Sequence, residues 1–204
     1  MTAMRIASSV LAMTMTTGEL CAQAPAQGER DRAMSYLHAT RKQFLDVVTQ
    51  LSAAQWKYKP ASGGWSVAEV AEHLTVTEGS VMAGIEQMLK APATPDKKAE
   101  AAGKDDVIMK GVPDRSRKVQ APEAMTPTGR FPTRDALVAE FKLRRDKTIE
   151  FIEKTPADLR AHMFPHPALK LIDCYQWILF LAAHSDRHIQ QMKEVMADPG
   201  FPKQ

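Results

Sequence analysis

Four long stretches of this chain carry apolar residues at three- and four-residue steps, the spacing of a helix that buries one face. They run from about Asp31 to Leu51, Ser66 to Leu89, Thr133 to Lys154 and Lys170 to Met196. No stretch shows the alternation expected of a strand. Because amphipathic helices must bury their apolar faces against one another, the sequence predicts an all-α four-helix bundle.

Capping residues support these boundaries. Ser66, followed three residues later by Glu69, has the spacing of a capping box, and Thr133 is a favourable residue just before a helix. Pro199 and Gly200 follow the last stretch and end it. The predicted helices therefore have start and stop signals as well as periodicity.

The connection between the second and third helices, residues 91–132, is much longer than an up-and-down bundle needs. Its prolines exclude one continuous helix, and Lys97–Lys110 is predicted to form a short one inside it. Such a connection lets the third helix begin at the same end of the bundle as the second, or lets the connection cross the bundle face. The remaining connections are residues 55–64 and 156–167.

Composition excludes several classes of protein. The 204 residues are 44% apolar and 25% charged, which is typical of a globular domain and not of a disordered or membrane-spanning chain. The formal net charge of +3 is too small to indicate nucleic acid or an anionic lipid surface as a partner. The length predicts one or at most two globular domains.

The first 24 residues have the pattern of a secretory signal peptide. Arg5 supplies a positive charge, Ile6–Met15 is mostly apolar, and the Ala-Gln-Ala sequence at 22–24 fits a cleavage site. The apolar run is too short to span a bilayer. We therefore expect export to the periplasm or beyond after cleavage near Ala24, leaving residues 25–204 as a single domain.

Two histidines stand one helical turn apart in the fourth helix. His184 and His188 share a face with Leu181 and Val195, so both imidazoles are expected to point into the bundle. His73 lies at the edge of the apolar face of the second helix, and antiparallel or crossed packing would bring it opposite the pair. Buried polar groups without partners cost about 1–3 kcal/mol each. A shared metal ion would be such a partner; a solvated pair and a satisfied core histidine are the alternatives.

Other polar residues are assigned no role at this site. Glu69 and Glu78 lie about one turn on either side of His73, and Arg144 and Arg145 are candidates for contact with an anionic substrate. We interpret all four as residues of solvated helix faces. Neither a zinc-protease H-E-x-x-H motif nor a phosphate-binding loop is present. The other histidines, and a cysteine predicted to be buried and inert, are also unassigned: His38, His162, His166 and Cys174.

Four motifs together resemble the DinB-like superfamily. In chain order they are GWSVAE at 64–69 leading into EHL at 72–74, KVQAP at 118–122, PTGRF at 127–131, and H-x3-H-x2-Q at 184–191. The two middle motifs are similar to a loop signature of one branch of that superfamily. The resemblance spans about residues 30–198.

The resemblance implies a four-helix bundle with an up-down-down-up arrangement, commonly a homodimer. It also implies one divalent cation, which could be zinc, nickel, iron or manganese, held by His73, His184 and His188. Gln191 matches a position that would support these ligands, and Trp65 matches a packing residue of a turn.

Two kinds of enzyme follow from the resemblance. Some relatives are transferases or isomerases that use a low-molecular-weight thiol, and others are described as metal-dependent hydrolases. Three imidazoles leave coordination positions open, as catalytic sites do. We expect a metal-dependent transferase or hydrolase acting on a small molecule; export argues against the thiol, because small thiols are mainly cytosolic. The alternative is a metal-binding envelope stress or interaction module without turnover, which a fourth protein ligand would favour.

Overall fold

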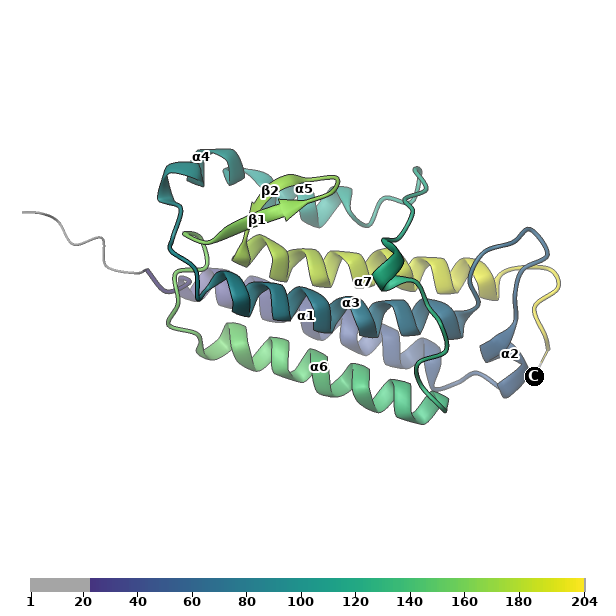
Figure 1. Ribbon diagram of the computed structural model, residues 1–204. Helices are drawn as coiled ribbons and strands as arrows, with labels where there is room; N and C mark the ends of the chain where they lie inside the picture. The colour runs from purple at the N-terminus through teal and green to yellow at the C-terminus, as the bar shows by residue number, and fades with distance from the viewer. Residues whose placement is uncertain (1–22, 204) are drawn as a thin grey trace, which may run out of the picture.

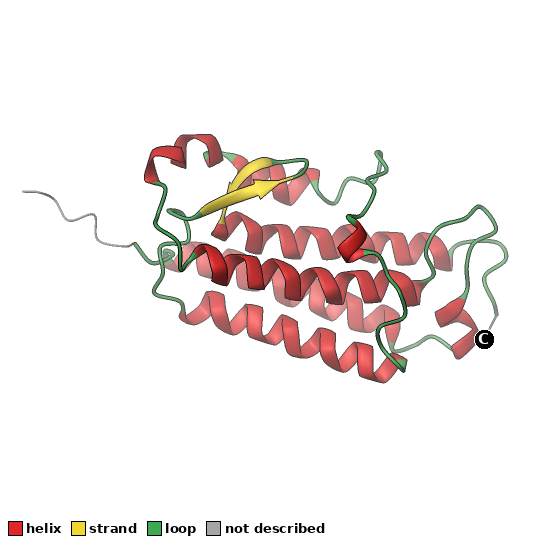
Figure 2. Ribbon diagram, viewed as in Figure 1, coloured by secondary structure: helices red, strands yellow, loops and turns green. Residues whose placement is uncertain are grey.

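The computed structural model describes residues 23–203 (Figure 1, Figure 2). Nearly all of the leader predicted over 1–24 lies outside the described residues. The bundle consists of four long helices: α1 (Gln27–Val48), α3 (Val67–Met88), α6 (Arg134–Lys154) and α7 (Cys174–Met196). The predicted four-helix bundle is confirmed.

The long helices run up, down, down and up, as the resemblance implied (Figure 1). α1 and α7 are parallel, since Tyr175 near the start of α7 donates to the Glu29 carbonyl near the start of α1. α6 is antiparallel to α1, since Arg134 at its start donates to the Leu51 carbonyl just beyond the end of α1. Helices α1 and α3 each pack against both α6 and α7.

The predicted apolar faces form the core. In α6, for example, Leu137, Phe141 and Ile152 are buried, and the Phe141 ring lies 3.9 Å from that of Phe44 on α1. The capping box at the start of α3 is also present, because Ser66 and Glu69 exchange hydrogen bonds. Sequence periodicity and capping chemistry thus account for the bundle.

Several short elements lie in the connections. A short helix, α2 (Ala53–Lys57), lies in the connection between α1 and α3. The crossover contains η1 (Pro95–Lys97), α4 (Lys98–Ala101), α5 (Lys104–Gly111) and η2 (Glu123–Met125). The single short helix predicted over 97–110 is therefore broken, and the break is at Gly103, whose φ of 73° is in the left-handed region that favours glycine.

One prediction about secondary structure is wrong. β1 (Met163–His166) and β2 (Lys170–Asp173) form an antiparallel pair, whereas the sequence showed no strand and placed the fourth helix from Lys170. Asp173 accepts a hydrogen bond from the backbone of Gln176 and so caps α7, which begins at Cys174. The hairpin lies beside the first turns of α7, where the Phe164 ring stacks on that of Trp177 at 4.4 Å (Figure 2).

None of the helices in residues 23–203 is long and apolar enough to cross a membrane.

Candidate metal centre

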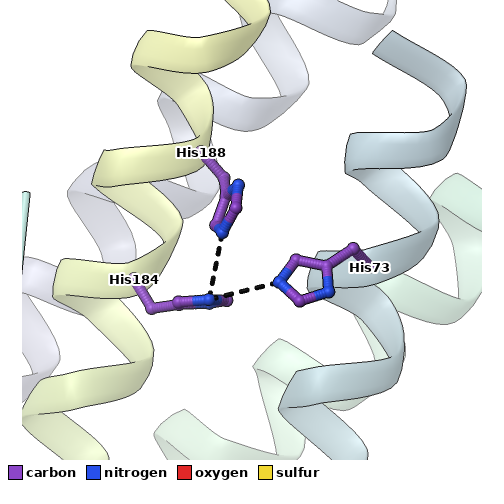
Figure 3. Close-up of side chains that lie close together, drawn as sticks. All are labelled: His73, His184 and His188. Atoms are coloured by element: carbon purple, nitrogen blue, oxygen red, sulfur yellow. Dashed lines mark hydrogen bonds between the residues drawn. The ribbon is translucent and has the colours of Figure 1, made fainter. Parts of the chain in front are cut away.

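Three imidazoles from two helices meet between α3 and α7 (Figure 3). His184 Nε2 lies 3.3 Å from His73 Nε2 and 3.1 Å from His188 Nε2. One ring nitrogen from each residue lies within 4.8 Å of the other two. The residues that the sequence singled out therefore converge on one point, with His73 opposite the pair on α7.

Local structure explains the convergence. His184 and His188 are one turn apart on α7, so their rings lie on the same face and meet edge to face, with centroids 4.4 Å apart. Because α3 is antiparallel to α7 and both helices pack closely, the buried face of α3 presents His73 to this pair. The two helices that carry the histidines are held in place by the core.

The hydrogen bonds at the outer ring nitrogens fix two of the tautomers. His73 Nδ1 lies 2.9 Å from the Met125 carbonyl oxygen, which can only accept, so Nδ1 carries the proton. His188 Nδ1 donates in the same way to Oε1 of Gln191, 2.7 Å away. In a neutral imidazole the other nitrogen is then an acceptor. Nε2 of His73 and Nε2 of His188 therefore both direct lone pairs toward His184.

These lone pairs outnumber the protons available to them. His184 Nε2 carries at most one proton and can donate it to only one of its two neighbours. Burial lowers the pKa of all three rings, in the case of His188 to about 3, which disfavours added protons. At least one buried acceptor is left without a donor, which is the arrangement that a cation would complete.

The spacing of the nitrogens also fits a metal ion. Tetrahedral coordination at Zn–N distances of about 2.0–2.1 Å separates ligand atoms by about 3.3 Å. The observed separations of 3.1 and 3.3 Å match this value. His73 and His188 are 3% and 9% exposed, and His184 is only partly exposed, so the cluster lies largely inside the bundle.

Within residues 23–203, no fourth histidine, cysteine or carboxylate joins this cluster. Its neighbours are aromatic: the Trp65 ring lies 5.0 Å from that of His73, and Phe180 stacks on His184 at 5.1 Å. Trp65 thus has the packing position that its motif implied. Among the described residues the cluster therefore offers three ligand nitrogens beside an aromatic wall.

Two residues interpreted as solvated are in fact buried. Arg145 and Glu78 are 0% and 1% exposed and form a bidentate ion pair, with distances of 2.8 Å from Nε to Oε1 and from Nη2 to Oε2. Arg145 lies between Phe141 and Ile149 on the apolar face of α6, a position that could have revealed its burial. Neither residue takes part in the histidine cluster.

The other unassigned residues remain outside the cluster. Glu69 caps α3 and pairs with Lys59, and Arg144 pairs with Glu140. His162 lies within hydrogen-bonding distance of a backbone carbonyl, and His38 is exposed. The His166 ring packs 4.6 Å from that of Phe180, which in turn stacks on His184.

Sequence reasoning missed three residues next to the histidines. Met125 supplies a backbone carbonyl, which no residue type signals, and Glu72 is a buried carboxylate within the EHL motif. Thr77, one helical turn from His73, has a buried hydroxyl without a hydrogen-bond partner among the described residues. Its place on the buried face of α3 was the available signal.

The fold and the cluster define a class of four-helix protein with a histidine triad between two antiparallel helices. The model of the DinB superfamily matches residues 36–192, more than half of the chain, and the chain belongs to this superfamily.

Two individual proteins are similar to this chain. The uncharacterized protein YuaE of Bacillus subtilis (strain 168) is 25% identical over 162 residues, which cover 79% of this chain and 96% of YuaE. The structure of YfiT from Bacillus subtilis, described as "a probable metal-dependent hydrolase with an unusual four-helix bundle topology", superposes with a TM-score of 0.58. At 16% identity over 88% of this chain and 92% of YfiT, this likeness establishes the shared fold.

Proposed function

We propose that this protein binds one divalent cation through His73, His184 and His188 and uses it to hydrolyse a small molecule. The observation that carries the proposal is the surplus of acceptors at the cluster: Nε2 of His73 and Nε2 of His188 face His184, which holds too few protons for both. A cation removes this deficit because all three nitrogens can then donate their lone pairs to it.

The chain's own residues orient the ligands. Met125 and Gln191 hold the outer nitrogens of His73 and His188, which keeps the inner ones directed at a common point. A cation bound there would lower the pKa of a coordinated water or polarise a carbonyl group of the substrate. The partly exposed edge of His184 is where a small substrate would enter.

Hydrolysis is favoured over thiol transfer for two reasons. YfiT, which shares the fold, is described as "a probable metal-dependent hydrolase". We also propose that residues 1–24 are a signal peptide and that residues 25–204 act as one exported domain, outside the compartment in which small thiols are abundant. Amino-terminal sequencing of the secreted protein tests this processing, and sedimentation of the mature form tests the homodimer that the family resemblance implies.

The activity is tested with mature protein loaded in turn with zinc, nickel, iron and manganese. One panel contains esters and amides, and a second contains electrophiles together with low-molecular-weight thiols. We expect turnover in the first panel and its loss in His188→Ala. The matched control is His38→Ala, which removes an exposed histidine outside the cluster and should leave turnover unchanged.

The outcomes separate the candidate functions. Turnover only with thiols would replace hydrolysis by transfer. If protein with a full complement of metal shows no turnover in either panel, an enzymatic role would be contradicted. A metal-binding module without turnover would then be favoured. Full metal content in His188→Ala would contradict the ligand assignment itself.

A further inference from the structure

The segment 122–131 lies against α3 beside the histidine cluster. Figure 1 shows η2, at the start of this segment, next to α3, after which the chain continues to the beginning of α6. Its closest link to the cluster is the Met125 carbonyl, 2.9 Å from His73 Nδ1. The position of this carbonyl therefore decides which nitrogen of His73 carries the proton.

Glu72, the residue before His73 on α3, binds the same segment. Glu72 is 4% exposed, and its carboxylate accepts hydrogen bonds from the backbone N–H groups of Thr128, Gly129 and Arg130 at 2.8, 2.9 and 3.3 Å. Gly129 has a φ of 77°, a conformation that a side chain would strain. Three consecutive backbone N–H groups of the segment thus bind one buried carboxylate.

Arg130 connects this anchor to Met125. Its guanidinium lies 3.2 Å from Glu72 Oε1 and donates to the carbonyls of Thr126 and Ala124 at 3.0 and 3.3 Å. Thr126 and Ala124 are the residues on either side of Met125. The guanidinium therefore fixes both peptide groups that flank the carbonyl facing His73.

We infer that Glu72 and Arg130 are positioning residues for the histidine site. Through Met125 they hold His73 as the Nδ1–H tautomer and so keep its Nε2 lone pair free for a cation. The inference deepens the proposed metal site and rests on it for its effect on affinity, whereas the tautomer is a property of the metal-free protein. Groups that orient a ligand in this way typically change metal affinity 10- to 100-fold when they are lost.

Two variants test the inference. Glu72→Gln keeps the side-chain size but places an amide NH2 against backbone donors, and Arg130→Met removes the guanidinium from an exposed residue. The matched control is Glu150→Gln, which breaks an exposed ion pair with Lys154 on α6. Circular dichroism establishes that each variant remains helical.

Three measurements are made on each protein. They are hydrogen exchange at the amides of 128–130 without metal, the nitrogen-15 shifts of the His73 ring without metal, and zinc affinity by competition with a chelator. We expect faster exchange and a mixed His73 tautomer in both variants, with zinc affinity lower by about 10- to 100-fold. The control should match the wild type in all three.

Each other result overturns a defined part of the account. Faster exchange with an unchanged His73 tautomer would show that the anchor holds the segment without positioning the ligand. Unchanged exchange would show that Glu72 and Arg130 do not anchor the segment. If the wild type bound no zinc but its variants shifted the His73 tautomer, the proposed function would fail while the positioning role stood.

Discussion

The histidine cluster and the buried pair of Arg145 with Glu78 are neighbours in the same bundle, because Ser185 of the second cluster directly follows His184 of the first. In the ion-pair cluster every guanidinium N–H of Arg145 has an acceptor: Glu78, the Leu37 carbonyl, Thr40 or Ser185. The Thr40 and Ser185 hydroxyls in turn donate to carbonyls of their own helices. Its charges and hydrogen bonds are complete within the protein.

In the histidine cluster, by contrast, the hydrogen-bond donors are fewer than the acceptors. Its outer nitrogens are satisfied by Met125 and Gln191, but its inner nitrogens offer more lone pairs than protons. Burial alone therefore does not distinguish a structural polar cluster from a binding site. The balance of donors and acceptors does, because a deficit must be met by something from outside the chain.

The largest effect on stability is expected from breaking the buried ion pair of Arg145 with Glu78. Arg145→Met leaves the Glu78 carboxylate buried without its partner, and we expect a loss of about 3–5 kcal/mol in the free energy of unfolding. The double variant Arg145→Met/Glu78→Leu removes both charges and should recover most of that loss. Urea unfolding of the metal-free proteins measures both values. A loss below about 1 kcal/mol in the single variant would mean that the pair is not an essential part of the core.

A smaller effect on stability is expected from zinc binding at the histidine cluster. Zinc at 100 times its dissociation constant should raise the free energy of unfolding of the wild type by about 2.7 kcal/mol, since only the folded state presents the site. His184→Ala should abolish this gain, and the Arg145→Met/Glu78→Leu double variant should retain it. Thermal or urea unfolding with zinc and with chelator makes the comparison. An equal gain in His184→Ala would place the zinc elsewhere.

The smallest of the three effects concerns acid. His188 has a pKa of about 3 in the folded metal-free protein, against an ordinary value of 6.5 when unfolded. Between these values the unfolded chain binds the extra proton, so the stability from this residue is complete above about pH 7 and is lost as the pH falls. We expect the loss to approach about 1 kcal/mol per pH unit below 6.5. Urea unfolding at pH 7, 6 and 5 should show a shallower slope for His188→Leu, and identical slopes would contradict the shift.

Much of the fold could be predicted because its signals are periodic and local. The apolar faces and the Ser66 cap located the long helices, and the shared face of His184 and His188 predicted that they point inward. The β1–β2 hairpin has strands too short for a recognisable alternation. It also takes the residues from Lys170 to Asp173 that would otherwise extend the α7 pattern.

The environment of the site was less predictable. The Met125 carbonyl is a backbone group, so its role depends on the path of the segment 122–131 and not on the identity of the side chain. Arg145 and Glu78 did leave a signal, since each interrupts an apolar face of its helix. Opposite charges on the buried faces of two helices indicate a pair, but only packing brings them to 2.8 Å.

The central claim is that the inner nitrogens of the histidine cluster lack protons that a metal ion replaces. Nitrogen-15 NMR of the imidazole rings, during a zinc titration of the mature protein, tests it most directly. We predict that His73 and His188 are Nδ1–H tautomers without metal, and that one equivalent of zinc shifts Nε2 of His73, His184 and His188 together. A proton on Nε2 of both His73 and His188 in the metal-free protein, or rings that do not respond to zinc, would contradict the account.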